Sequence, residues 1–184
     1  MFSQGSLSLI KTNTMKTYPF TREQLEKITE THPTPFHIYD EAGIRANYRA
    51  MKEAFAWSPG YRNFYAVKAC PNPTLLRILQ DEESGMDCSS LGELVLSEKL
   101  GFTGKDIMFT SNETPLEDYK KAYELGANIN IDDLTHIDYL LKHFGKMPEI
   151  GSFRYNPGAL KKGNVIIGDP EEAKFGITHD QALA

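Results

Sequence analysis

The sequence of 184 residues has few cysteines, no excess of positive charge and no long apolar run. Its two cysteines, Cys70 and Cys88, are too few for a disulfide framework, and neither they nor the five histidines show metal-ligand spacing. The net charge is -5 with scattered cations, which is unlike the basic surface that binds nucleic acid. No apolar stretch approaches the roughly 20 residues that span a bilayer, and residues 1–16 lack a signal-peptide core. We therefore expect a soluble, cytoplasmic protein with no metal site, no nucleic-acid partner and no membrane span.

The composition, with 40% hydrophobic residues, is sufficient for the core of one ordinary domain. Residues 1–17 are polar and aperiodic, which predicts a disordered leader. Residues 18–60 predict a helix capped by Thr21, a strand over "PFHIYD" at 35–40, and an amphipathic helix over 41–57. Residues 61–184 then carry a regular alternation of short strands and helices.

This alternation predicts a parallel sheet covered by helices. The strand candidates are "YRNFYAVKA", "SGMDCSS", "KDIMFTS", "GANINID" and "EIGSFRYNP", and the segments between them have apolar residues at helical spacing. Three of these helices end at a glycine, at positions 101, 126 and 145. Such a chain forms either an open doubly wound sheet or a (β/α) barrel. No glycine-rich dinucleotide fingerprint follows the first strand, which weighs against the dinucleotide-binding version.

Lys68 is unusual because it is the last polar residue of a strand-like run, "RNFYAVKA". Alternation in a strand would place it on the same face as Phe64 and Ala66, at the carboxyl end where parallel α/β folds build their active sites. A desolvated lysine there would have a lowered pKa and serve as an amine nucleophile. The alternative is a lysine that extends into solvent or pairs with a carboxylate.

Other polar residues fall at the ends of the same strands, namely Asp87, Asn130, Asp132 and Arg154. Arg154 shares a face with Ser152 and Asn156, so an amine, a carboxylate and a guanidinium would converge on an anionic ligand. The alternative for Asp87 is an Asx turn or the N-cap of the helix near Leu91. For Asp132 and Asp133 we favour a role in the turn into the next helix.

An ordered set of motifs gives the sequence a resemblance to a known family. "FYAVKACPNP", "GMDCSSLGELVLSEKLGF", "IMFTSNETPLEDYKKAYELGANINIDDLTHIDYL", "SFRYNPG" and "EAKFGI" resemble, in this order, elements of the fold-type III pyridoxal-phosphate decarboxylases. The resemblance covers residues 33–180, and "RYNPG" is more similar to diaminopimelate decarboxylases than to ornithine decarboxylases.

The resemblance implies a fold, a cofactor and site residues. The fold would be a partial (β/α)8 TIM-type barrel of the alanine racemase-like group, with about five of eight strands in 61–184. Lys68 would be the catalytic lysine that holds pyridoxal 5'-phosphate as a Schiff base, with Asp87, Glu93 and Arg154 around the cofactor. The implied reaction is decarboxylation of an amino acid, meso-diaminopimelate to L-lysine in lysine biosynthesis, by an enzyme that is a homodimer when complete.

The sequence also departs from the family, since it ends after the fifth strand and lacks the later phosphate-binding loops and the C-terminal β domain. We therefore expect the chain to be inactive alone. The remaining alternatives are another substrate, as in carboxynorspermidine or arginine decarboxylases, and a truncated, non-catalytic relative that acts as a binding or regulatory subunit.

Overall fold

The computed structural model describes residues 18–149, 151–158 and 175–183 and divides the chain into two units, residues 1–40 and 41–184. The boundary falls inside the stretch 18–60 that we expected to form one segment. The leader predicted over 1–17 lies outside the described residues. In the part of the chain that is described, no helix is both long and apolar enough to cross a membrane.

The first unit contains helix α1 (Arg22–Thr31), which begins where the sequence predicts. The Thr21 hydroxyl accepts from the Gln24 backbone N–H, and the Gln24 side chain accepts from the Thr21 N–H in return, a capping box. The strand predicted over 35–40 is wrong, because these residues form no strand. A strand needs a neighbour to bond its N–H and C=O groups, and within the described residues none pairs with this segment.

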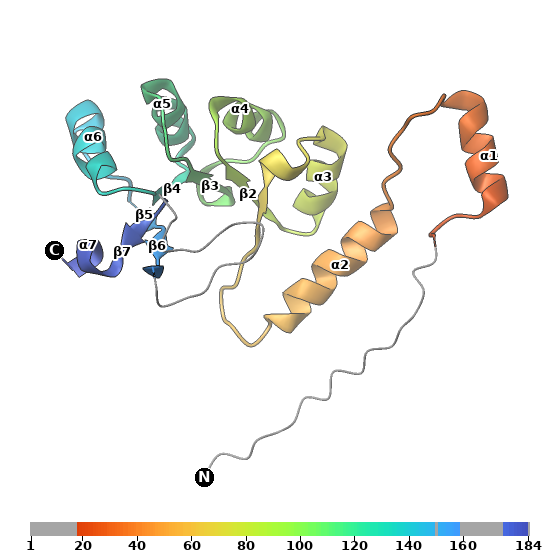
Figure 1. Ribbon diagram of the computed structural model, residues 1–184, viewed down its shortest axis with the longest axis horizontal. Helices are drawn as coiled ribbons and strands as arrows, with labels where there is room; N and C mark the ends of the chain where they lie inside the picture. The colour runs from red at the N-terminus through yellow and green to blue at the C-terminus, as the bar shows by residue number, and fades with distance from the viewer. Residues whose placement is uncertain (1–17, 150, 159–174, 184) are drawn as a thin grey trace, which may run out of the picture. The chain divides into compact units, whose positions relative to one another are not determined.

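The second unit is built on a parallel sheet of five strands, as predicted. They are β1 (Phe64–Ala66), β2 (Gly85–Cys88), β3 (Ile107–Thr110), β4 (Asn128–Ile131) and β5 (Gly151–Phe153). Their spatial order is β1-β2-β3-β4-β5, so each crossover connection leads to the adjacent strand (Figure 1). Successive adjacent parallel strands are the pattern of a (β/α) barrel, whereas a doubly wound sheet reverses its strand order at one point.

Four helices cover one face of this sheet (Figure 1). They are α3 (Pro73–Asp81), α4 (Leu91–Lys99), α5 (Leu116–Leu125) and α6 (Thr135–Phe144). Asn72 caps α3 through bonds from Thr74 N and Leu75 N, with Pro73 as the first helical residue. Gly126 and Gly145 end α5 and α6 in the left-handed conformation, as the sequence predicts.

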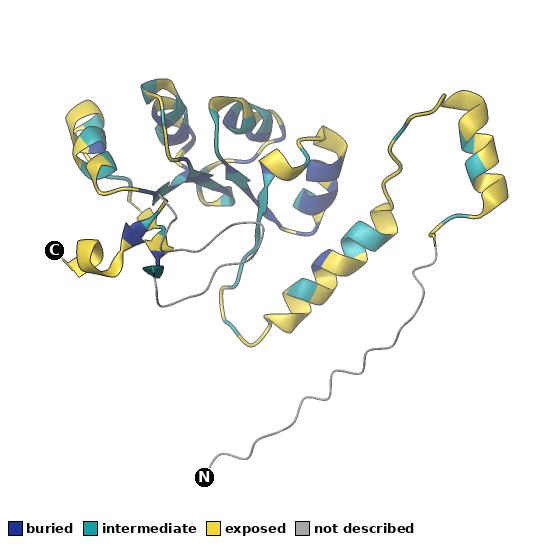
Figure 2. Cartoon of the chain, viewed as in Figure 1, coloured by how far each residue is buried: buried dark blue, intermediate teal, exposed yellow. Residues whose placement is uncertain are grey.

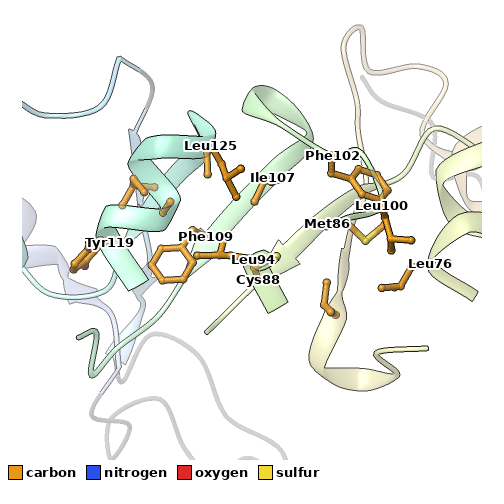
Figure 3. Close-up of a cluster of buried hydrophobic side chains, with 14 of the residues drawn as sticks. Leu76, Met86, Cys88, Leu94, Leu100, Phe102, Ile107, Phe109, Tyr119 and Leu125 are labelled. Atoms are coloured by element: carbon orange, nitrogen blue, oxygen red, sulfur yellow. The ribbon is translucent and has the colours of Figure 1, made fainter. Parts of the chain in front are cut away.

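The core lies between the helices and the sheet, where the helix sides that face the strands are buried (Figure 2). The strand residues on this face are apolar and fully or almost fully buried, and Figure 3 shows several of them against helix residues: Met86, Cys88, Ile107 and Phe109 with Leu76, Leu94 and Tyr119. Burying a large apolar side chain contributes about 1.5–3 kcal/mol. Period-two alternation therefore directs the intervening strand residues to the opposite face.

Helix α2 (Glu41–Ala54) packs against α3 through a group of ion pairs. The Glu82 carboxylate accepts from Arg45 at 3.1 Å and from Arg49 at 2.6 and 2.7 Å. These guanidinium groups, that of Arg49 first, lower the Glu82 pKa to about 2 although burial opposes the shift. Tyr48 on the same helix is buried in the core.

A small second sheet follows the fifth strand. The run "EIGSFRYNP" is not one strand, because it bends at Arg154 and continues as β6 (Tyr155–Asn156), which pairs in parallel with β7 (Ile177–Thr178). Helix α7 (His179–Leu183) begins directly after β7. The backbone of Arg154 bonds both sheets, since its N–H donates to Ile131 O and its C=O accepts from Ile177 N.

Candidate functional site

Lys68 lies just beyond the carboxyl end of β1, in the turn that follows the strand, whereas the sequence predicted it within the strand. The strand ends at Ala66, and Lys68 belongs to the single 3-10 turn Val67–Ala69. The prediction that it continues the strand is wrong, because the register pairs the last β1 residue, Ala66, with Asp87 and the chain then turns. Its side chain is exposed, so the expected desolvation is also absent: the core forms on the other side, around buried Val67. The amine is nevertheless at the active-site end of the sheet.

The sheet face opposite the helices carries a chain of polar side chains on four adjacent strands. Thr110 Oγ1 donates to Asp87 Oδ1 at 2.9 Å, Asn130 Nδ2 donates to Thr110 Oγ1 at 3.4 Å, and Ser152 Oγ donates to Asn130 Oδ1 at 2.8 Å. The strand registers pair Thr110 with Asn130 and Asn130 with Ser152, whereas Asp87 is paired with Met108, so that Thr110 reaches Asp87 diagonally from two residues further along β3. This row of four side chains is here called the polar ladder.

The charges of the other predicted site residues, Lys68, Glu93 and Arg154, all act on the pKa of Asp87. Burial raises its pKa, the hydrogen bond from Thr110 opposes that rise, and the charges of Lys68 and Arg154 also lower the pKa while Glu93 raises it. A turn or capping role for Asp87 is excluded, because Ser90 caps the next helix. The Asp87 carboxylate therefore lies on the polar face of the sheet, where the charges of Lys68 and Arg154 act on it.

Glu93 is close to this group but already has partners. Its carboxylate accepts from Ser89 N at 2.8 Å and from the hydroxyls of Ser89 and Ser90 at 3.1 and 3.3 Å. Glu93 is the third residue of α4, so its negative charge also interacts favourably with the positive end of the helix dipole. Its clearest role in this structure is to fix the turn between β2 and α4.

Arg154 pairs with an aspartate that the sequence did not assign to it. Its Nη1 lies 2.8 Å from Asp132 Oδ1, although the N–H is not aligned on that buried oxygen, and its Cζ lies 5.8 Å from the centre of the Phe175 ring. Both aspartates lie in the turn between β4 and α6, as predicted; Asp133 accepts from Thr135 N at 2.8 Å, whereas the Asp132 carboxylate lies against Arg154. Local spacing indicates the turn but not the partner of Asp132, which lies 22 residues away in the sequence.

Gly176 allows the backbone at residues 175–176 to lie close to Arg154. It has φ +90°, and a Cβ there would lie 3.0 Å from Arg154 O and 3.3 Å from Asn156 Cβ. The buried Asn156 amide donates to Phe175 O at 3.2 Å. The residues around Phe175 therefore hold the backbone from which Arg154 projects.

The cysteine and histidine side chains to which the sequence analysis gave no metal site make structural contacts. Cys88 is fully buried, contacts Ser97 Oγ at 3.3 Å, and has a pKa raised to about 12 by burial. His136 Nδ1 lies 2.9 Å from the Tyr119 hydroxyl, and His143 packs on the Tyr139 ring. No metal-binding cluster of histidine, cysteine and acidic residues is found in the described ranges.

Two hollows open at the opposite, amino edge of the sheet. One is lined by residues that include Tyr61 and Arg62, the other by residues that include Asn128 and Lys146, and Lys105 borders both. None of the four predicted site residues lines either hollow. The chemistry-bearing group is thus at the carboxyl edge, as the positional argument requires.

A parallel β/α sheet with an amine and converging charges at its carboxyl edge defines part of a barrel-type enzyme fold. Residues 41–184 match the pyridoxal-binding domain of the pyridoxal-dependent decarboxylases. The chain belongs to this family.

Individual relatives agree with this assignment. Protein TabA of Pseudomonas amygdali pv. tabaci is 42% identical over 153 residues, 83% of this chain and 35% of that protein. The diaminopimelate decarboxylase of Methanothermobacter thermautotrophicus is 33% identical over 159 residues, 85% of this chain and 37% of that protein. The chain therefore spans little more than a third of the length of these relatives.

Solved structures give the same fold. A lysine decarboxylase from Selenomonas ruminantium has a TM-score of 0.75 at 25% identity, over 91% of this chain and 42% of its own. The diaminopimelate decarboxylase from Helicobacter pylori, complexed with L-lysine, has a TM-score of 0.72 at 29% identity, over 86% and 41%. The predicted partial barrel is confirmed.

Proposed function

We propose that the chain binds pyridoxal 5'-phosphate through Lys68 and supplies one part of the site of an amino-acid decarboxylase. The observation that carries this proposal is the position of Lys68, an exposed primary amine at the carboxyl end of β1, electrostatically coupled to Asp87. The residues present fit the cofactor chemically, because the amine is a nucleophile for its aldehyde and Arg154 is a fixed cation for an anionic group. Asp87 and Glu93 complete the proposed cofactor-facing group.

The bound cofactor would supply an electron sink for the electrons left when a carboxylate departs as carbon dioxide. The residues of this chain bind and orient. Lys68 Nζ acts as nucleophile in its neutral form, and the cationic Arg154 is held by Asp132 and Phe175. The Asp87 carboxylate, fixed by Thr110, contributes negative charge on the same face.

We propose meso-diaminopimelate as the substrate of the complete enzyme, with L-lysine as product. This is supported by the Methanothermobacter relative and by the Helicobacter structure, whose names give that activity. The Selenomonas structure favours a second candidate, lysine or a related amino acid. Release of carbon dioxide from each amino acid by a longer protein that contains this chain would distinguish them. We further propose that this protein is a cytoplasmic homodimer, to be checked by light scattering and cell fractionation.

We propose that the 184 residues alone do not turn over substrate. Lys68 is exposed and the polar ladder lies on a face that is only half-buried, so water is not excluded from the reacting centre. Charge interactions that accelerate such reactions are much weaker in water than in a closed site.

The test is reductive trapping. The chain is mixed with pyridoxal phosphate, reduced with borohydride, digested and analysed by mass spectrometry. We expect the cofactor's mass on the peptide that contains Lys68, together with a change in cofactor absorbance that Lys68→Ala abolishes. Lys105→Ala is the matched control, since Lys105 is also exposed but lies at the amino edge of the sheet. Equal labelling of Lys68 and Lys105 would overturn the proposal.

A further inference from the structure

The polar ladder gives Asp87 a partner that neither the family assignment nor the proposed cofactor residues include. We propose that Thr110 is a positioning residue for Asp87, and that Asn130 and Ser152 fix the direction in which its hydroxyl donates. The inference rests on the proposed function only in that Asp87 faces the cofactor. The ladder itself consists of three hydrogen bonds between adjacent strands.

The direction of the ladder follows from the donors available at each position. The Asn130 side chain has a donor nitrogen and an acceptor oxygen, and its orientation is assigned from its neighbours. Ser152 Oγ lies 2.8 Å from Asn130 Oδ1, which leaves Nδ2 directed at Thr110 Oγ1, 3.4 Å away. The Thr110 oxygen is thus an acceptor on that side, and its single proton is directed to Asp87 Oδ1 at 2.9 Å.

The Ser152 hydroxyl determines the direction of the first hydrogen bond in the polar ladder. Its hydroxyl has one proton and two acceptors in reach, Asn130 Oδ1 at 2.8 Å and the Met108 sulfur at 4.0 Å. An amide oxygen is a far stronger acceptor than a thioether, and its distance is that of an ordinary O–H···O bond. The proton therefore goes to Asn130, and every donor in the ladder is directed toward Asp87.

The effect at Asp87 is to hold one carboxylate oxygen and to favour the ionised form. Within the described residues, Thr110 is the one hydrogen-bond donor to this carboxylate, and Oδ2 accepts none. The charged groups that act on Asp87 are Lys68 after β1, Glu93 on α4 and Arg154 after β5. Burial favours the neutral acid and raises the pKa of Asp87, and the bond from Thr110 opposes that rise by favouring the carboxylate.

The test follows the titration of Asp87 by carbon-13 NMR in the full 184-residue chain, with Asp87→Asn to assign its signal. Thr110→Val keeps the shape of the side chain but removes the hydroxyl, and Thr110→Ser keeps the hydroxyl. We expect Thr110→Val to move the midpoint to higher pH and Thr110→Ser to leave it near that of the parent chain. A Thr110→Val midpoint equal to that of the parent would overturn the inference.

Ser152→Ala provides the second variant, because Ser152 is exposed on the edge strand and its change should not affect folding. It removes the donor that orients the Asn130 amide, so we expect a smaller upward shift in the same direction. If Thr110→Val does not fold, this variant decides, and an unchanged midpoint contradicts the ladder. These titrations need no cofactor. Failure of trapping at Lys68 would therefore count against the proposed function alone, and an unmoved Asp87 midpoint against Thr110 alone.

Discussion

Gly85 is the position where a single methyl group should destabilise the sheet most directly. It is paired with Phe64 across β1 and β2, and the Phe64 ring lies over it. A Cβ at residue 85 would be 2.4 Å from Phe64 Cδ1 and 2.6 Å from Cε1, far inside carbon–carbon contact distance. A shift of the ring would disturb its contact with Arg62, whose Cζ lies 5.4 Å from the ring centre and whose guanidinium pairs with Asp106 at 2.6 Å.

We expect Gly85→Ala to lower the free energy of unfolding by about 1–3 kcal/mol, the usual cost of forcing an extra carbon into a packed site. In a Phe64→Ala background the ring is gone, and the next atom in order of distance is the Asp106 carbonyl oxygen, 3.1 Å from the new Cβ. There we expect the same change to be nearly neutral. The two substitutions should thus be coupled by about 1–3 kcal/mol.

The assay is urea unfolding of the four members of this cycle, followed by circular dichroism. Gly92→Ala is the control, because no atom lies within 4 Å of the Cβ it would add inside α4. That variant should gain about 0.4–1 kcal/mol from the lower entropy of the unfolded chain. Equal effects of Gly85→Ala with and without the Phe64 ring would refute the reasoning.

Three further predictions concern the core and its charges. Phe109→Ala, at a side chain 1% exposed, should cost about 3–5 kcal/mol in urea unfolding, and a cost below 1 kcal/mol would contradict the packing. Because the Glu82 pKa is lowered from 4.5 to about 2, ionised Glu82 stabilises the fold above about pH 4.5, and this stability is lost as the pH falls toward 2. Glu82→Gln should flatten that pH dependence; an unchanged acid transition would contradict it. Cys88, with its pKa near 12, should resist iodoacetamide in the native chain at neutral pH and react after unfolding, as mass spectrometry would show.

The sequence predicted the order of elements in residues 61–184 because apolar periodicity and terminal glycines are local signals. The end of β1 was not accessible in this way, since "FYAVKA" alternates equally well as a strand or as a strand followed by a turn. Its end is set by the last pairing, Ala66 with Asp87, which involves the neighbouring strand. The segment 35–40 failed for the same reason, because its residues suit a strand but strands form in pairs.

In the candidate site too, local features could be predicted from the sequence, whereas contacts between strands could not. Lys68, Asp87 and Arg154 could be proposed from their places at strand ends and from a resemblance, and the structure puts their charges within reach of one another. Asp132 and Asp133 are adjacent in sequence and equally suited to the turn before α6, yet Asp133 accepts from the backbone N–H of Thr135 while Asp132 lies against Arg154. Thr110 carried a signal, as the terminal residue of "IMFT" on the polar face, but its bond to Asp87 became evident only from the structure, because the register pairs Asp87 with Met108.

Strand β2 shows how core and site share the same few residues. In "GMDC", Met86 and Cys88 are fully buried against the helices, while Asp87 between them is turned to the other face. Burial raises the pKa of both Cys88 and Asp87, but the two side chains differ in how far their other contacts oppose that rise. For the thiol it removes reactivity, because the Ser97 hydroxyl does not offset the loss of water. For the carboxylate, the bond from Thr110 and the charges of Lys68 and Arg154 oppose the rise and favour the charged form. The alternation that builds the core therefore also separates an inert thiol from a charged group one residue away.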